Sequence, residues 1–188
     1  GWFDIDWQPA KAELRGKVLA PFLGDHYGRV LERGELRLSF DPESGAFSVW
    51  YHEHRFPVAA YTLAALLSER QPLLARELGS GHPALRGLRD LLADLAAGPA
   101  PGRSGDAAGA AGRERAEGAK RALARLARDE PAVRRWLDGV AEACNGSAGE
   151  PSSFVRLHEL LEAQHYRLAF WRVAADEIYG RAYHVPAG

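Results

Sequence analysis

The sequence predicts an α+β fold, with a small antiparallel β-sheet built on a hairpin at about residues 34–57 and an inserted, orthogonal helical subdomain. Two observations lead to this prediction. Apolar and polar residues alternate on both sides of a turn that contains Pro and Gly, which is typical of a hairpin with one buried face. Between Tyr61 and Gln164 the apolar residues recur with a helical period instead. The length of 188 residues suits one core of ordinary size.

The hairpin gives the clearest local pattern in the chain. Its predicted inward-facing residues are Leu36, Leu38 and Phe40 on one strand and Phe47, Val49 and Tyr51 on the other. The turn between them, residues 41–45, reads Asp-Pro-Glu-Ser-Gly, and these residue types favour tight turns. Pro57 is expected to end the second strand, because proline has no N–H to donate to a neighbouring strand. The segment from Tyr166 to Trp171 predicts a further strand.

Five helical stretches follow the hairpin. We expect them from about Tyr61 to Gln71, from Pro83 to Gly98, after Gly112, from Pro131 and from Pro151. Pro72 should stop the first of them, because proline removes a helical hydrogen bond. The fourth carries its apolar side chains on one face: Val133, Trp136, Leu137, Val140, Ala141 and Cys144.

The pattern divides the chain into two predicted parts. Residues 1–60 together with 151–188 form a small α/β subdomain, and residues 61–150 form a helical subdomain. Residues 98–112 consist almost wholly of Gly, Ala and Pro and carry no bulky apolar side chain. They therefore predict a flexible linker inside the helical part.

Charge and composition exclude several classes of partner. The chain has 24 Lys and Arg against 25 Asp and Glu, whereas proteins that bind nucleic acid usually carry a basic excess. We therefore expect no nucleic acid and no membrane partner. The longest apolar run, Val58 to Leu67, is shorter than the ~20 residues that cross a bilayer. A start at Gly1 without Met or a signal peptide suggests a segment excised from a longer cytoplasmic protein.

Paired carboxylates are the first candidates for catalysis. Asp4 and Asp6 would share one face of a strand at roughly 6.6 Å, which lies within the range of about 6.5–9.5 Å seen in inverting glycosidases. Neighbours on one strand rarely flank a bond from opposite sides, so we favour a hydrogen-bonding or surface role. Asp176 and Glu177 are adjacent and would point apart.

Histidine and cysteine suggest metal or nucleophilic chemistry only weakly. His52 and His54 form an H-x-H pattern that could place two ligands on one face, but no third ligand follows at a suitable spacing. We interpret both as polar residues of the hairpin surface or of a cleft, and we expect no metal and no cofactor. Cys144, the only cysteine, lies on an apolar helical face and is expected to be a buried thiol.

Aromatic residues interleaved with charged ones suggest carbohydrate binding. Sugar rings stack on aromatic faces, while charged side chains bind the hydroxyl groups. The residues concerned are Trp2, Phe3, Trp7, Trp50, Tyr51, Trp171 and Tyr179. Core packing explains most of them equally well, so both interpretations stay open.

Long strings at both ends of the chain resemble the maltooligosyltrehalose synthases. They are residues 2–7 (WFDIDW), 14–19 (LRGKVL), 21–24 (PFLG), 27–28, 34–38 (GELRL), 40–41, 53–57 (EHRFP), 157–164 (LHELLEAQ) and 166–178 (YRLAFWRVAADEI). The similarity covers residues 2–60 and 150–178, and the helices between them match in character. After Ile178 the sequence departs from the family pattern.

The resemblance implies a place within an enzyme. That family belongs to the alpha-amylase superfamily and converts the terminal alpha-1,4 bond of a maltooligosaccharide into an alpha,alpha-1,1 bond, in trehalose biosynthesis. The chain is similar to the insertion after the third strand of the (β/α)8 barrel and is not a complete barrel. The catalytic acids of the family lie in barrel motifs that no string here resembles, so the resemblance assigns no catalytic residue.

The resemblance also implies a binding role and partners. We expect a non-catalytic domain that helps to form a maltooligosaccharide cleft, with the barrel of the parent chain as its partner. The expected substrate-binding residues are Asp6, Trp7, His54, Arg55, Trp171, Arg172 and Asp176. The alternatives are a free-standing glucan-binding module and a structural α+β domain without a ligand.

Overall fold

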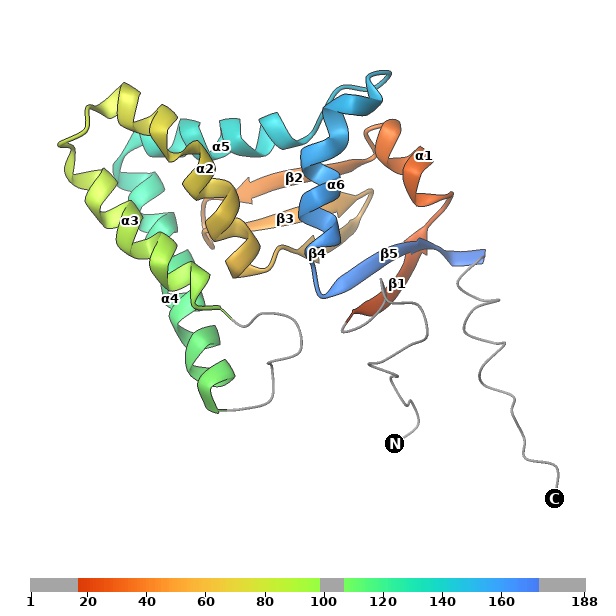
Figure 1. Ribbon diagram of the computed structural model, residues 1–188, viewed down its shortest axis with the longest axis horizontal. Coiled ribbons are helices and arrows are strands. Elements are labelled where there is room, and N and C mark those ends of the chain that lie inside the picture. Colours follow the sequence, from red (N-terminus) through yellow and green to blue (C-terminus); the bar gives the residue numbers. More distant parts are fainter. Residues whose placement is uncertain (1–16, 99–106, 173–188) are drawn as a thin grey trace.

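The computed structural model describes residues 17–98 and 107–172, which form a mixed helix and strand fold (Figure 1). A three-stranded antiparallel sheet comprises β2 (Leu36–Asp41), β3 (Ala46–Tyr51) and β4 (His54–Pro57). A separate parallel pair comprises β1 (Val18–Leu23) and β5 (Tyr166–Phe170). The described strands form no closed barrel, which confirms the predicted α+β class with its small antiparallel sheet.

The β2–β3 hairpin confirms the predicted faces. Leu36 pairs with Tyr51, Leu38 with Val49 and Phe40 with Phe47, and all six side chains are buried. The second strand, however, does not continue to Pro57 as predicted. It ends at Tyr51, and the chain reverses through His52 and Glu53 into β4, which pairs with β3. His52 makes this reversal possible by adopting a left-handed φ of 51°.

The β2–β3 turn is tightly packed against a helix. Gly45 adopts φ +71°, and its N–H donates to the Asp41 carbonyl oxygen at 2.8 Å. A Cβ atom at this position would lie 1.8 Å from the carbonyl oxygen of Lys120. Glycine is therefore required both by the backbone conformation and by the close approach of the helix.

Helices supply most of the remaining structure. They are α1 (Tyr27–Glu32), α2 (Ala60–Leu78), α3 (Pro83–Ala96), α4 (Ala107–Asp129), α5 (Pro131–Cys144) and α6 (Val155–Glu162), with the 3-10 helix η2 (Pro151–Phe154) before α6. The predicted apolar face of α5 is confirmed, because all six of its predicted side chains are buried. Pro83 and Pro131 occupy the first turns of α3 and α5, where proline costs no hydrogen bond.

Helix α2 continues through Pro72, although this residue was predicted to stop it. Burial of Leu74, which is fully inaccessible, favours another helical turn beyond the proline. The indole N–H of Trp136 also donates to the Arg70 carbonyl oxygen at 3.1 Å, and this bond ties α2 to α5 close to the proline. Tertiary packing thus outweighs the local cost of proline.

Helix α4 begins earlier than predicted. It starts at Ala107, inside the segment 98–112 that was expected to be a flexible linker. Residues 99–106 lie outside the described residues. Gly98 is buried, and a Cβ atom on it would lie 3.1 Å from the Cβ of Ala60, so the end of α3 packs closely against α2. Small residues here permit close helix packing.

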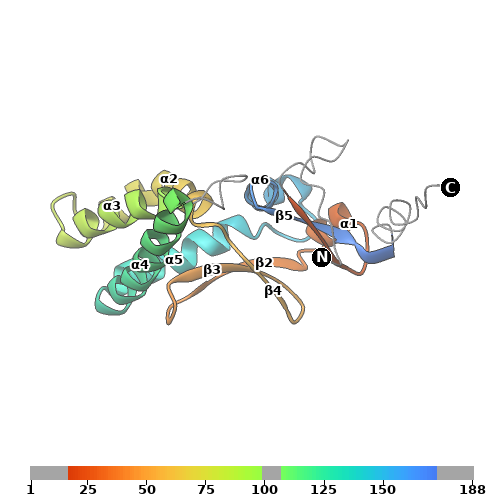
Figure 2. The ribbon, with the colours of Figure 1, turned by 90° about the horizontal axis from the view of Figure 1, so that it is seen from below.

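Helices α5 and α6 lie on one side of the three-stranded sheet, and in the described part no helix covers its other side (Figure 2). Helix α5 contacts β2, and Asn145 just after α5 completes this junction. Its Oδ1 accepts from the Leu38 N–H at 2.6 Å, and its Nδ2 donates to the Leu38 carbonyl oxygen at 3.0 Å. The amide therefore binds the free edge of β2 as a neighbouring strand would.

One continuous apolar cluster joins the sheet to the helices. It extends from Leu23 of β1 through the hairpin and α2–α5 to Leu168 of β5. No helix within residues 17–98 and 107–172 is both long and apolar enough to cross a membrane.

Candidate functional site

The structure describes four of the seven residues that sequence analysis predicted to bind substrate. His54 and Arg55 lie on β4, and Trp171 and Arg172 follow β5. Asp6, Trp7 and Asp176 lie outside the described residues. The two carboxylate pairs considered for catalysis, Asp4 with Asp6 and Asp176 with Glu177, lie outside them as well.

His54 and Arg55 face opposite sides of β4, because successive strand residues alternate. His54 is on the side of Phe22, a β1 residue whose ring centroid lies 5.0 Å from the imidazole. The ring centroids of Phe22 and Phe56 lie 5.6 Å apart, and those of Phe56 and Tyr166 of β5 lie 5.7 Å apart. This aromatic row connects β4 to the parallel pair and places His54 next to it.

Trp171 and Arg172 lie at the same end of the parallel pair as His54. Leu23, the neighbour of Phe22, pairs in register with Phe170. The ring centroids of Trp171 and Phe170 lie 6.3 Å apart, and the Arg172 guanidinium carbon lies 5.1 Å from the centre of the Trp171 ring. We call Phe22, His54, Phe170, Trp171 and Arg172 the β1–β5 end.

The β1–β5 end is accessible and offers groups that can bind a polyhydroxylated ligand. Phe22 is 48% exposed and Trp171 is 51% exposed, so each presents an apolar ring to solvent. His54 and Arg172 add hydrogen-bonding groups beside these rings. Aromatic faces beside polar groups are typical of surfaces that bind sugars or other proteins.

Arg55 belongs to a different surface, on the uncovered side of the three-stranded sheet. Its Nε donates to the Ser48 hydroxyl at 2.8 Å, and its Nη2 lies 3.7 Å from Oδ2 of Asp41. The Ser44 hydroxyl donates to Asp41 at 2.6 Å and, with the Glu43 amide, lowers the pKa of that carboxyl below its ordinary value. The predicted site residues therefore divide between two faces of the fold.

The metal and thiol interpretations gain no support from the geometry. His52 occupies the turn and His54 begins β4, so the H-x-H pair does not lie along one strand as two ligands would need. Within the described ranges, no group of three His, Cys, Asp or Glu side chains could hold a metal ion. Cys144 is fully buried, as predicted, and burial raises the pKa of its thiol.

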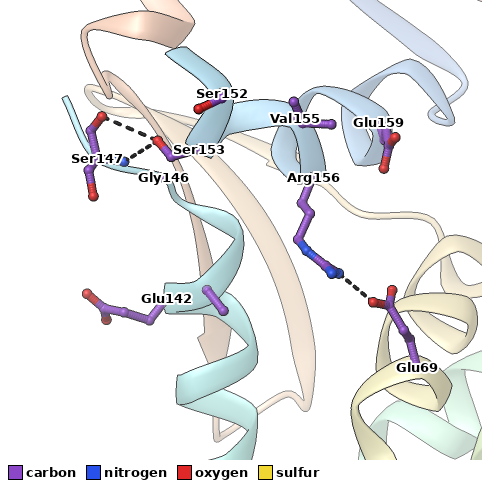
Figure 3. Close-up of a pocket in the computed structure, with 10 residues that line it drawn as sticks. Glu69, Glu142, Gly146, Ser147, Ser152, Ser153, Val155, Arg156 and Glu159 are labelled. Carbon is purple, nitrogen blue, oxygen red and sulfur yellow. Dashed lines mark hydrogen bonds and ion pairs between the residues drawn. The ribbon is translucent and has the colours of Figure 1, made fainter. Parts of the chain in front are cut away.

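A pocket of about 720 Å³ lies where α2, the end of α5 and the start of α6 meet (Figure 3). Arg156 reaches across from α6, and its guanidinium lies 2.6 Å from Oε1 of Glu69 on α2. Ser153 accepts from the Ser147 N–H at 2.7 Å and donates to the Glu150 carbonyl oxygen at 2.6 Å. Its hydroxyl therefore caps a turn, and no histidine lines the described pocket to activate it.

Sequence reasoning missed this pocket and the division of the site into two faces. No motif in the sequence connects Glu69 with Arg156, because their proximity arises from helix packing. The separation of His54 from Arg55 follows from strand alternation, and that signal was available. Comparison of the chain with protein-family models, curated proteins and solved structures finds no match.

Proposed function

We propose that this chain acts as a non-catalytic insertion domain similar to that of the maltooligosyltrehalose synthases. In this role it helps to form the maltooligosaccharide cleft of a cytoplasmic intramolecular transglucosylase, beside the (β/α)8 barrel of the parent chain. The helices from α2 to α5 then form the inserted helical subdomain. The barrel supplies the catalytic carboxylates, and this chain supplies binding groups only.

The observation that carries the proposal is the pairing of β1 with β5. These strands lie in the two strings that resemble the family, at opposite ends of the sequence, and they run side by side and parallel. Parallel strands are normally covered on both faces. Phe22 and Trp171 remain about half exposed at one end of this pair, which suits a surface that meets the rest of a cleft.

The residues of the β1–β5 end have complementary roles in this proposal. The Trp171 ring, with the Arg172 guanidinium 5.1 Å from its centre, offers an apolar surface beside hydrogen-bond donors. His54, fixed against Phe22, adds a group that can donate to or accept from a sugar hydroxyl. Such contacts stabilise substrate without accelerating the bond exchange, which requires stronger interactions in the transition state.

The test is a graft into an active enzyme. We replace the corresponding region of a maltooligosyltrehalose synthase by this chain and measure trehalose-ended product from maltohexaose. We expect the graft to be active and the isolated chain to leave the reducing ends of maltohexaose intact. His54→Ala and Trp171→Ala in the graft should raise KM about threefold to tenfold and leave kcat little changed, as expected for loss of one hydrogen bond or ring contact that serves binding only.

The control is Arg89→Ala, a change of an exposed side chain on α3 that should leave the kinetics unaltered. A graft that folds with an unchanged melting temperature but forms no trehalose-ended product contradicts the proposal. Turnover of maltohexaose by the isolated chain contradicts it too, because the chain would then hold its own catalytic acids.

A free-standing glucan-binding module is the second candidate. The continuous apolar cluster favours it, since the described strands and helices share one core. An inactive graft combined with maltohexaose binding by the isolated chain would select this alternative.

A further inference from the structure

A groove of about 550 Å³ lies along the outer edge of β2, where that strand meets α5. It is separate from the β1–β5 end. The side chains that give it chemical character are Arg37, Ser39, Trp50, Arg134, Asp138 and Glu142. Its volume falls in the range that small ligands occupy in proteins.

Trp50 is held in place before any ligand arrives. Its indole N–H donates to the Ser39 hydroxyl at 2.9 Å, so the ring lies across β2 toward the groove. The Arg55 guanidinium carbon lies 5.8 Å from the ring centre, and Arg55 is itself fixed by its bond to Ser48. Because the ring is already ordered and 38% exposed, a ligand can pack on it with little loss of side-chain entropy.

The charges around the groove are balanced. Arg134 Nε lies 2.7 Å from Oδ2 of Asp138, and Arg37 Nη2 lies 4.0 Å from Oε1 of Glu142. Each guanidinium that lines the groove therefore has a carboxylate partner. A phosphate or nucleic-acid ligand would need an unbalanced positive charge. The rim instead offers donors and acceptors together, which suits a neutral ligand with many hydroxyl groups.

We propose that this groove binds a neutral oligosaccharide, with one pyranose ring packed on Trp50 and its hydroxyls bonded to the two charge pairs. The site goes beyond the proposed function, because it lies at the outer edge of β2 beside α5 and uses none of the residues of the β1–β5 end. It would hold a glucan chain whether or not the β1–β5 end forms part of a catalytic cleft.

The experiment is a titration of the 188-residue chain, followed by nitrogen–proton correlation spectra, with maltohexaose in one arm and cellohexaose in the other. We expect the Trp50 indole signal and the amide signals of Ser39 and Arg134 to shift with a single dissociation constant of about 1 mM. The two arms distinguish an alpha-linked glucan from a beta-linked one. Either ligand producing these shifts supports the proposal.

Variants then separate this site from others. Trp50→Ala should weaken binding at least about tenfold, and Ser39→Ala about threefold through loss of the bond that orients the ring. The matched control is Trp171→Ala, which removes another half-exposed indole and should leave the Ser39 and Arg134 shifts unchanged. Dispersed amide spectra confirm that each variant remains folded.

Three results overturn the proposal. The first is that neither glucan shifts the Trp50 signal at 10 mM, about ten times the expected dissociation constant. The second is that the shifts appear but Trp50→Ala leaves the affinity unchanged. The third is that the shifts are confined to Phe22, His54 and Trp171, in which case the groove inference fails while the proposed function at the β1–β5 end survives.

Discussion

Gly45 joins the hairpin turn to helix α4, and its replacement by alanine should be among the most damaging single-methyl changes in the described chain. Two costs add. An L-residue at φ +71° costs about 1–2 kcal/mol. The new Cβ atom would also lie 1.8 Å from the Lys120 carbonyl oxygen and 2.9 Å from the Ala124 amide nitrogen, whereas real Cβ atoms essentially never come within 3.0 Å of such atoms.

The turn must therefore move away from α4 by more than about 1 Å, and the neighbouring atoms are backbone atoms that cannot rotate aside. Forced displacement of a packed segment costs about 1–3 kcal/mol. Together with the φ cost, we expect Gly45→Ala to lower the free energy of unfolding by about 2–5 kcal/mol. This is a large part of the about 5–15 kcal/mol that stabilises a typical domain.

The measurement is urea unfolding followed by circular dichroism, with Gly34→Ala as the matched control. Gly34 has a similar φ of +68°, but its Cβ atom would come no closer than 3.8 Å to Phe154, which is ordinary contact. The control should therefore lose only the backbone cost of about 1–2 kcal/mol. If the two variants lose equal stability, the close approach of Lys120 to the turn is wrong.

Three further predictions concern buried and charged groups. Tyr166→Phe should leave the free energy of unfolding unchanged or raise it by up to about 1 kcal/mol, because the buried Tyr166 hydroxyl has no hydrogen-bond partner among the described residues. A clear loss of unfolding free energy in urea would argue against this. Asn145→Ala should lower the free energy of unfolding by about 2–4 kcal/mol in the same assay, because it leaves the Leu38 N–H and carbonyl oxygen unpaired. A loss of less than about 1 kcal/mol would contradict the role of Asn145 as the partner of the β2 edge. The lowered pKa of Asp41 stabilises the fold above the ordinary carboxyl pKa of 3.8, and this contribution disappears as the pH falls through the lowered value. Ser44→Ala should therefore raise the pKa of Asp41 in a carboxyl NMR titration and flatten the acid limb of the stability profile, and an unchanged pKa would exclude the hydroxyl as the main cause.

The sequence alone determined the elements whose cause is local. Strand alternation identified the buried faces of β2 and β3, and the helical period identified the buried face of α5 through Trp136 and Cys144. These predictions succeed because the burial of one face depends on the spacing of apolar residues along a single element. The turn at Gly45 was also predicted from local sequence, here from the residue types that favour tight turns.

Tertiary structure decided the departures from the local pattern. Local rules end α2 at Pro72, yet burial of Leu74 and the bond from Trp136 favour its continuation. Local rules extend one strand to Pro57, yet His52 reverses the chain so that β4 can pair with β3. In both cases the stabilising contacts come from residues distant in the sequence, which no local pattern contains.

The candidate sites divide in the same way. The sequence alone indicated which residue types are suited to binding, including His54, Arg55 and Trp171, and strand alternation already required His54 and Arg55 to face apart. Only the tertiary structure brought β1 beside β5, so that Trp171 came to the end where His54 lies. The tertiary structure alone also places Trp50 beside the groove at α5, because the packing of α5 against β2 determines where the groove lies. Residue chemistry is carried by the sequence, whereas proximity between distant segments is decided by the apolar core that joins them.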